Sequence, residues 1–485
     1  MNRQIRGVGI VLMALFVALF LQLNYLQVVD AHKLAHDPRN TRLALATFAH
    51  ARGAIQTSDG VVVAQSVPSN DGFKYQRQYP QPDLFAQITG YFSFTYGTEG
   101  VEQTYDSELN GSAQRARVVN PLNLLKSDRQ QFGNVTLTLS SKLQQVAKDA
   151  LGNKKGAVVA LDPTNGNILA LWSFPSYDPN LLASHATKDV AVSWSRYQAD
   201  PSHPMLPRAY RERFFPGSTF KVVTSAAALE KAPDLTTKVY PSETSIELPQ
   251  TNHQRLSNFG GERCGGSLND ILRISCNTAF AQMGLDLGAD KLASQAMAFG
   301  FDHRPPLDLP AVAQGKFPDA SAFAHDLPAL AKSAIGQQDV AATPLQMALV
   351  AAGVANGGVV MKPHVMAEVR DSEGTVVRQM GAEPWMRAMS AENAARLRDL
   401  MIGVVRAGTG TAARLPGIDV AGKTGTAQTG RNTAHAWFIA FAPAAAPKIA
   451  IAVIVEDQPG VGDATGGKIA APIAKAVMQA ALAAP

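Results

Sequence analysis

The sequence predicts an α+β protein with an N-terminal transmembrane helix, and three observations support this prediction. The 485 residues are 46% hydrophobic and 17% charged, a composition typical of a globular chain long enough for two or more domains. An uncharged apolar run lies near the N-terminus. Strand-like runs lie at both ends of residues 154–485 with mainly helical sequence between them, so we expect a sheet flanked by helices there.

The apolar run predicts an uncleaved signal anchor over residues 7–29. It holds about 20 consecutive residues without a charge, which is the length needed to span a bilayer. A cleaved signal peptide is the alternative, but its apolar core would be shorter and would end in a small-residue cleavage site, whereas Gln22 follows here. Arg3 and Arg6 place residues 1–6 in the cytoplasm. We therefore expect a single-pass protein of the plasma membrane whose remaining chain is extracytoplasmic.

Residues 30–153 form the first predicted domain, with mixed secondary structure. Short strands are expected at 61–64 and 134–139, and a helix with one apolar face is expected at 140–151. No part of the segment has the residue spacing of a nucleophile, a base or a metal ligand. We interpret it as a non-catalytic pedestal or dimerisation-like domain.

Residues 154–485 form the second predicted domain. Two apolar runs around a turn rich in Pro, Asn and Gly predict a β-hairpin at 156–172. Further strands are expected at 434–442 and 448–456, followed by a helix at 468–482. The first and last strands of the domain are expected to pair in an antiparallel sheet.

Charge and composition exclude several classes of function. The formal net charge of +5 is modest and unclustered, and it fits a nearby anionic surface such as a membrane or a wall polymer. The sequence has no basic run with interleaved aromatic residues, no phosphate-binding loop and no Cys/His cluster. We expect no nucleic-acid partner, no cofactor and no metal site.

The one Ser-x-x-Lys sequence of the chain places Ser218 and Lys221 three residues apart. On a helix these positions share a face, so the lysine amine can reach the serine hydroxyl and accept its proton. Pro216 and Gly217 predict a helix start, which puts Ser218 where free N–H groups and the helix dipole favour developing negative charge. Four such residues alone are more often a solvated helix start than an active site.

Two further motifs change this interpretation. Ser275 and Asn277 form a Ser-x-Asn sequence, and Lys423-Thr424-Gly425 is the one Lys-[Ser/Thr]-Gly of the chain. In this order the three motifs are the signature of serine β-lactamases and penicillin-binding proteins. A second Ser-x-Asn, Ser267-Leu-Asn269, competes for the role, but its surroundings indicate a loop that runs into a helix N-cap.

With these motifs the sequence resembles a class B penicillin-binding protein, a membrane-anchored D,D-transpeptidase, and most closely the shorter actinobacterial members of the class. The resemblance covers nearly the whole chain and implies a β-lactamase-like serine transpeptidase fold for residues 154–485. Beyond the three motifs, it includes Arg52-Gly-Ala-Ile55, Glu99-Gly100, Gly156 to Trp172, Arg211 to Ala228, Asn277 to Phe280, Gly336-Gln337, Thr343 to Ala348, Asn356 to Gly358 and Ala436 to Phe438.

The resemblance implies a serine acyl-enzyme formed on the terminal D-Ala-D-Ala of a peptidoglycan stem peptide. Ser218 would attack the peptide carbonyl, and Lys221 would be the base, which requires a neutral amine although free lysine has a pKa of about 10.4. A second ammonium at Lys423 and partial burial would lower the pKa of Lys221. Ser275 would relay the proton to the leaving amine, and Asn277 would hold Lys221 and the substrate amide.

The same resemblance implies how substrate binds. Lys423, Thr424 and Thr426 would form a rim for the terminal carboxylate, and the N–H groups of Ser218 and Thr426 would form the oxyanion hole. Gly425 would let the substrate backbone approach the strand edge closely. An acceptor amine from a second strand would complete the cross-link, and a β-lactam would leave Ser218 as a stable ester.

The implied partners are stem peptides, lipid-linked precursor strands, β-lactams, the membrane and a separate glycosyltransferase of the elongation or division machinery. The glycosyltransferase would be separate because residues 30–153 are too short and too poor in motifs to polymerise glycan. A D,D-carboxypeptidase or β-lactamase, with water as the acceptor, is an alternative, although the deacylating carboxylate motif of a β-lactamase is not found. A penicillin-binding sensor or scaffold is another, although a sensor needs more cytoplasmic chain than residues 1–6.

Three smaller features accompany these motifs. Cys264 and Cys276 are the only cysteines, and an even pair outside the membrane suggests a disulfide, with two idle thiols as the alternative. Gly336-Gln337-Gln338 stands where the resembled family has Gly-Gln-Gly, which leaves the local turn open. His435 lies just before Trp437 on a predicted strand, and we interpret it as structural.

Overall fold

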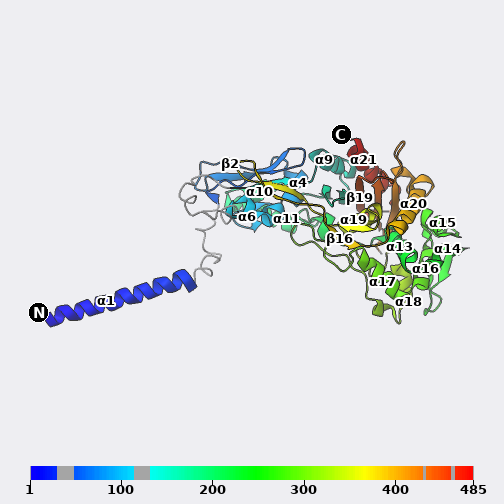
Figure 1. Cartoon of the computed structure of the whole chain (residues 1–485), viewed down its shortest axis with the longest axis horizontal. Coiled ribbons are helices and arrows are strands. Elements are labelled where there is room, and N and C mark those ends of the chain that lie inside the picture. The colour runs from blue at the N-terminus through cyan, green and yellow to red at the C-terminus, as the bar shows by residue number, and fades with distance from the viewer. Residues whose placement is uncertain (1, 30–47, 114–131, 430–432, 460–464, 484–485) are drawn as a thin grey trace. The chain divides into compact units, whose positions relative to one another are not determined.

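An apolar helix begins the described part of the chain. Helix α1 (Asn2–Asn24) continues into the π-helical turn η1 (Tyr25–Val29). Within the described residues, this is the one helix long and apolar enough to cross a membrane, over Arg3–Val28, and its apolar side chains are exposed. The predicted apolar helix at 7–29 is therefore confirmed. The computed structural model describes residues 2–29, 48–113, 132–429, 433–459 and 465–483 (Figure 1), so residues 30–47 and 114–131 of the predicted pedestal lie outside it.

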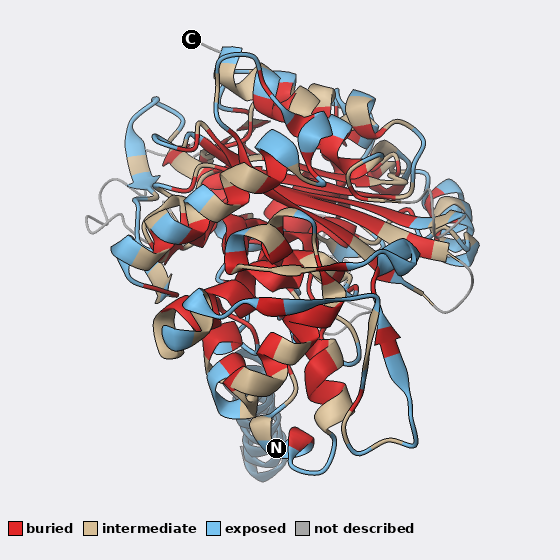
Figure 2. Ribbon diagram, turned by 90° about the vertical axis from the view of Figure 1, so that its right-hand side faces the viewer, coloured by how far each residue is buried: buried red, intermediate tan, exposed pale blue. Residues whose placement is uncertain are grey.

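A five-stranded antiparallel sheet is the centre of the second predicted domain. The predicted hairpin is confirmed, as are the two late strands, and the first strand pairs antiparallel with the last, Gly156 opposite Val455. Both faces of the sheet are buried (Figure 2), so the central strands are apolar at nearly every position and do not alternate between apolar and polar residues. The strand order is β17 (Ala421–Gln428), β18 (Thr433–Ala442), β19 (Ile449–Pro459), β7 (Gly156–Leu161) and β8 (Ile168–Phe174).

Helices cover both faces of this sheet. On one face α21 (Ala470–Ala483) packs on β18 and β19 and contacts α9 (Ser141–Leu151), which lies on β8. On the other face lie α19 (Pro344–Ala355) and α20 (Ala391–Ala407). The predicted helices at 140–151 and 468–482 are thus confirmed to within about two residues. The side chain of Thr343 accepts a hydrogen bond from the N–H of Gln346 (3.0 Å), which caps α19.

The turn that carries Ser218 differs from the predicted helix start. Residues Gly217–Phe220 form a 3-10 turn, η2, and the α-helix α13 (Lys221–Lys231) begins only at Lys221. Gly217 has φ = 52°, and its N–H donates to the carbonyl of Gly336 (2.9 Å) rather than within a helix. The 3-10 turn has three residues per turn, so Ser218 and Lys221 still lie on one face.

The remaining elements surround this centre. The short strands are β9 (Tyr240–Glu243), β10 (Ser245–Glu247), β11 (Arg255–Ser257), β12 (Cys264–Gly266), β13 (Val359–Met361) and β16 (Pro384–Arg387). The helices and 3-10 turns are α10 (Asn180–Ala183), α11 (Thr187–Ala199), α12 (Arg208–Arg211), α14 (Asp234–Thr237), η3 (Phe259–Gly261), α15 (Leu268–Arg273), α16 (Asn277–Leu287), α17 (Ala289–Ala298), η4 (Ala320–Phe323), α18 (Leu327–Ser333) and η5 (Thr411–Ala413).

A second sheet combines strands from both predicted domains. The predicted strands at 61–64 and 134–139 are found as β2 and β6, and β14 and β15 join them from much later in the sequence. The order is β15 (Val376–Gln379), β14 (Met366–Arg370), β6 (Asn134–Leu137), β1 (Ile55–Gln56), β2 (Val62–Pro68) and β3 (Tyr75–Gln78). The other elements between residues 82 and 109 are α4 (Pro82–Thr89), β4 (Phe92–Ser93), β5 (Gly97–Thr98), α5 (Gly100–Thr104) and α6 (Asp106–Leu109).

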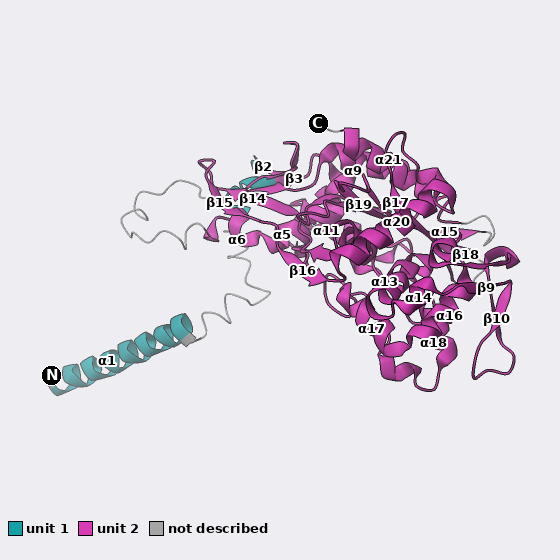
Figure 3. Ribbon diagram, turned by 45° about the vertical axis from the view of Figure 1, so that its right-hand side comes forward, with its two compact units in different colours: residues 1–51, 67–76 teal, residues 52–66, 77–485 magenta. Residues whose placement is uncertain are grey.

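The chain divides into two compact units, residues 1–51 with 67–76 and residues 52–66 with 77–485 (Figure 3). In the second unit the buried carboxylate of Glu102 accepts from the guanidinium groups of Arg52 (2.5 Å) and Arg77 (2.6 Å). A buried carboxylate between two buried arginines compensates the loss of their hydration. The five-stranded sheet and the candidate site also lie within this second unit.

Candidate active site

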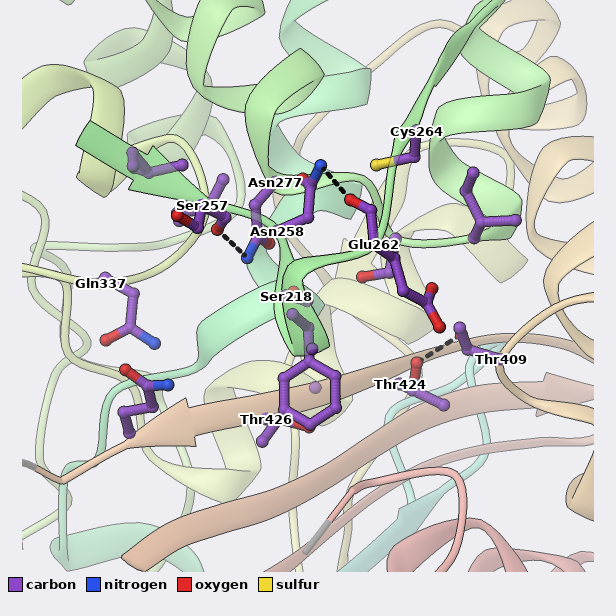
Figure 4. Close-up of a pocket in the computed structure, with 18 of the residues that line it drawn as sticks. Ser218, Ser257, Asn258, Glu262, Cys264, Asn277, Gln337, Thr409, Thr424 and Thr426 are labelled. Atoms are coloured by element: carbon purple, nitrogen blue, oxygen red, sulfur yellow. Dashed lines mark hydrogen bonds between the residues drawn. The ribbon is translucent and has the colours of Figure 1, made fainter. Parts of the chain in front are cut away.

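The residues of the three sequence motifs meet in one cleft of about 1220 Å³ (Figure 4). Ser218 comes from η2, Ser275 and Asn277 from the start of α16, and Thr424 from β17, the strand at the edge of the five-stranded sheet. Gly425 and Thr426 also line the cleft, whereas the side chains of the two motif lysines lie below it, fully buried. The fold therefore assembles every residue that the sequence singled out for chemistry.

Lys221 is held as a buried amine with two strong acceptors. Its Nζ atom donates to the carbonyl of Ser275 and to Oδ1 of Asn277, both at 2.7 Å, and lies 3.3 Å from Oγ of Ser275. Burial lowers the pKa of Lys221 well below its ordinary value, and the positive charge of Lys423 lowers it further. A neutral amine has two N–H groups, which these two acceptors occupy, and one lone pair that remains free to take a proton.

Lys423 approaches the same hydroxyl from the sheet. Its Nζ atom donates to Oγ of Ser275 at 2.8 Å and to the carbonyl of Thr424 at 3.0 Å, and burial lowers the pKa of Lys423 to about 7. The Ser275 hydroxyl thus lies between two amines. Ser275 has φ = 62°, the left-handed region that non-glycine residues rarely adopt, and this strained backbone aims its side chain between the two lysines.

Ser218 lines the cleft on the 3-10 turn and is partly exposed. Within the described part of the chain its hydroxyl makes no hydrogen bond, so the expected contact with Lys221 is not formed in this structure. Its backbone N–H likewise has no hydrogen-bond acceptor among the described residues. Contacts between a nucleophile and its base are often long in a free enzyme, and an unpaired N–H is what an oxyanion hole requires.

The edge of β17 forms the opposite wall. Thr424 Oγ1 lies 2.6 Å from Oγ1 of Thr409, so two hydroxyl groups stand together beside the buried Lys423 (Figure 4). Among the described strands β17 pairs only with β18, which leaves its second edge free for an extended peptide. Hydroxyl groups, a buried amine and a free strand edge together fit a peptide that ends in a carboxylate.

Gly425 has a packing role that the sequence did not indicate. A Cβ atom at Gly425 would lie 2.9 Å from Cγ2 of Thr219, 2.9 Å from Cβ of Trp437 and 3.0 Å from the carbonyl of Pro216. These atoms belong to the turn that carries Ser218 and to strand β18. The glycine therefore lets the turn that carries Ser218 lie directly on β17.

A disulfide and an asparagine hold the segment on the far side of the cleft. Cys264 and Cys276 are bonded, with their Cα atoms 5.8 Å apart. Asn258 accepts a hydrogen bond from the N–H of Thr278 (2.9 Å) and donates to the carbonyl of Glu262 (2.9 Å; Figure 4). This segment is thereby tied to the start of α16, where Ser275 and Asn277 lie.

Two of these residues were missed by the sequence analysis. Thr409 and Asn258 lie outside the three motifs, and neither has a neighbour at catalytic spacing in the sequence. Thr409 reaches the site because its N–H donates to the carbonyl of Arg273 beside the Ser-x-Asn turn. A local pattern in a single sequence does not predict tertiary contacts between residues so far apart.

The competing residues have other roles. Ser267 forms a capping box with Asp270 at the start of α15, as the sequence indicated, and is not in the cleft. His435 packs edge-on against Phe214 (5.3 Å between ring centres) and accepts from the N–H of Asp457, while burial lowers the pKa of its imidazole. Among the described residues, no group of three or more His, Cys, Asp or Glu side chains is placed to hold a metal ion.

Comparisons with known proteins agree with this geometry. Residues 156–479 match the penicillin binding protein transpeptidase domain, and residues 52–135 match the penicillin binding protein A dimerisation domain. Peptidoglycan D,D-transpeptidase PbpA of Mycobacterium tuberculosis is 42% identical over 99% of each chain. Peptidoglycan D,D-transpeptidase MrdA of Acinetobacter baumannii is 30% identical over 79% of this chain and 63% of that protein.

A solved structure is similar throughout. The ceftriaxone acyl-enzyme complex of penicillin-binding protein A from M. tuberculosis has a TM-score of 0.82 and 40% sequence identity. The similarity covers 90% of this chain and 100% of that one.

Substitution of Gly425 tests the packing of the nucleophile turn. We expect Gly425→Ala to lower the free energy of unfolding by about 1–3 kcal/mol because the new Cβ overpacks the contact between η2 and β17. Denaturant unfolding of the detergent-solubilised full chain measures this. Gly381→Ala is the matched control, since a Cβ there meets no atom within 4 Å and the change should stay within about 0.5 kcal/mol. Equal stability of the two variants would show that the turn does not need the glycine.

Proposed function

Because this chain belongs to the penicillin-binding protein transpeptidase family and is a peptidoglycan D,D-transpeptidase, we propose that Ser218 is its acylated nucleophile and that β-lactams acylate the same hydroxyl. One observation carries the proposal: the hydroxyl of Ser275 lies between two buried amines, 3.3 Å from Lys221 and 2.8 Å from Lys423. A proton can therefore pass between the buried amines of Lys221 and Lys423 through the hydroxyl of Ser275, beside the turn that carries Ser218.

The first half of the reaction forms an ester. The Ser218 oxygen attacks the carbonyl carbon between the two D-Ala residues, and the hydroxyl proton passes to the lone pair of Lys221. The oxygen that becomes negative is stabilised by the N–H groups of Ser218 and Thr426, a contribution of about 10²–10³ in rate for each donor. The C–N bond then breaks, and the Ser275 hydroxyl delivers a proton to the leaving D-Ala amine while Lys221 or Lys423 replaces it.

The second half consumes the ester. An acceptor amine attacks the acyl carbon, a proton returns to the Ser218 oxygen, and a new peptide bond joins the two stem peptides. A β-lactam follows only the first half because its leaving amine stays attached in the same molecule. Its carboxylate would bind where the terminal carboxylate of D-Ala-D-Ala binds, at Lys423, Thr424 and Thr426.

The anchor and the cysteines support a location. Arg3 and Arg6 lie in the first turns of α1, ahead of its uncharged apolar run, which favours a cytoplasmic side for residues 1–6 and an extracytoplasmic chain after residue 29. A disulfide between Cys264 and Cys276 fits an oxidising compartment. We take residues 7–29 as the anchor, 30–153 as a pedestal and 154–485 as the transpeptidase domain, supported by the matched ranges 52–135 and 156–479.

A separate glycosyltransferase would supply the glycan strands, because the pedestal carries no residues spaced for that chemistry. Site-specific cross-linking from the pedestal in intact membranes tests this partnership. Cross-links to the wall machinery should include a polymerase, and their absence would contradict it.

Intact-mass analysis after incubation with a β-lactam tests the nucleophile. We expect the wild-type chain to gain one stable adduct and Ser218→Ala to gain none, because the substitution removes the attacking oxygen. Ser267→Ala is the control, since that serine belongs to the other Ser-x-Asn and only caps α15. An adduct on Ser218→Ala would overturn the assignment, and a wild type that sheds its adduct within seconds would indicate a β-lactamase.

Thiol counting tests the disulfide. Alkylation of the unfolded, unreduced protein isolated from membranes should add no label, and alkylation after reduction should add two, because the two cysteines of the chain are bonded. Two labels before reduction would rule out the disulfide and remove one support for the extracytoplasmic location.

A further inference from the structure

A second strained residue lines the cleft besides Ser275. Gln338 has φ = 64°, a left-handed conformation that glycine adopts freely and glutamine only at a cost. Of the described non-glycine residues with positive φ, Ser275 and Gln338 are the two that line the cleft. Ser275 uses its strained backbone to direct a hydroxyl, whereas Gln338 has no role in the chemistry described above.

Backbone hydrogen bonds on both sides of Gln338 join its segment to the segment that leads to Ser218. The carbonyl of Gly336 accepts from the N–H of Gly217 at 2.9 Å, and Phe214 and Ala342 exchange two backbone hydrogen bonds, both of 2.9 Å. The segment that contains Gln338 is therefore fastened on both sides to the segment that leads to Ser218. The backbone at Gln338 is thereby held beside the turn that carries Ser218.

The side chain of Gln338 is available to a ligand. The residue is exposed, and its amide makes no hydrogen bond to the described residues. A glutamine amide offers two N–H donors and a carbonyl acceptor, which match the groups of a peptide backbone.

The position along the cleft indicates which part of the substrate is near. Figure 4 shows the neighbouring Gln337 and the Thr409–Thr424 pair on opposite sides of Ser218. In the proposed function, the terminal carboxylate lies at Thr424 and the attacked carbonyl lies at Ser218. The stem peptide on the N-terminal side of the D-Ala-D-Ala bond must therefore leave Ser218 away from Thr424, along the wall that Gln338 lines.

We propose that Gln338 is a specificity-determining residue for the donor stem peptide. Its side-chain amide hydrogen-bonds the donor backbone on the N-terminal side of D-Ala-D-Ala, an inference that rests on the proposed function. A residue in a strained conformation persists where its side chain contributes something that glycine cannot.

Two ester substrates that differ in length test this proposal on the detergent-solubilised full chain. The longer is an N-acyl-aminoacyl-D-Ala-D-lactate, and the shorter is N-acetyl-D-Ala-D-lactate, which lacks the residue that Gln338 would contact. We expect Gln338→Ala and Gln338→Gly to lower kcat/KM for the longer ester about fivefold, the effect of one neutral hydrogen bond. The value for the shorter ester should stay within about twofold of that of the wild-type enzyme.

Unfolding and a matched control separate strain from recognition. Gln338→Gly should unfold at the same or a higher temperature than wild type, because glycine removes the strain, so its loss of kcat/KM is not a loss of folding. Ala311→Gly is the control, since Ala311 is exposed, has φ = 55° and does not line the cleft. It should leave both esters unaffected.

Three results would overturn the proposal, and a fourth would contradict the proposed function on which it rests. Equal losses on the two esters would make Gln338 a structural part of the nucleophile turn, and no loss on either would leave its amide without a role. A change confined to transfer onto an added amine would assign it to the acceptor. If neither the esters nor a β-lactam acylate the wild-type chain, the proposed function itself is contradicted. If a β-lactam acylates the chain normally and the Gln338 variants keep the wild-type kcat/KM on both esters, only the Gln338 inference is contradicted.

Discussion

The amines of Lys221 and Lys423 converge on the hydroxyl of Ser275 from a helix and from a sheet, and neither amine is exposed to solvent. Two ammonium groups cannot share such a place without water, because burial and mutual repulsion both disfavour the charged forms. The pKa of each lysine is accordingly lowered. The proposed chemistry depends on this constraint, because an interior that disfavours the charged form of Lys221 leaves an amine that can accept a proton.

The surrounding helices and the sheet hold these three side chains in position. Lys221 is the first residue of α13, and Lys423 lies on β17. Asn277 is the first residue of α16, and Ser275 lies just before it. The geometry therefore depends on how these two helices meet one strand. Small residues at the contacts allow the close approach. A Cβ at Gly425 would collide with the turn that carries Ser218, and a Cβ at Gly336 would lie 2.2 Å from the carbonyl of Gly217. Contacts on two sides therefore fix the turn of Ser218.

The sequence predicted the elements whose signal is local or carried by a motif. The hairpin at 156–172, the late strands, the capped helices and the N-terminal apolar helix all follow from apolar period and turn residues, and the structure contains each of them. The three motifs identified the residues of the cleft, although no spacing in the sequence fixes distances between elements hundreds of residues apart.

The sequence could not reveal what arises from tertiary contacts. The 3-10 turn under Ser218 exists because the N–H of Gly217 pairs with Gly336, and that partner lies far away in the sequence. Asn258 and Thr409 have no catalytic neighbours in the sequence. Strands β14 and β15 join a sheet whose other strands lie between residues 55 and 137. The packing role of Gly425 likewise depends on Thr219 and Trp437, which only the folded chain brings near.

The pH dependence of acylation by a β-lactam tests the neutral lysine most directly. If Lys221 is the base, the acylation rate of the wild-type chain should rise with pH and level off well below the pKa of about 10.4 of free lysine. In Lys423→Met the rising limb should move to higher pH, because the positive charge that helps to lower the pKa of Lys221 is gone. A wild-type rate that is still rising near pH 10, or a limb that moves to lower pH in the variant, would contradict the account.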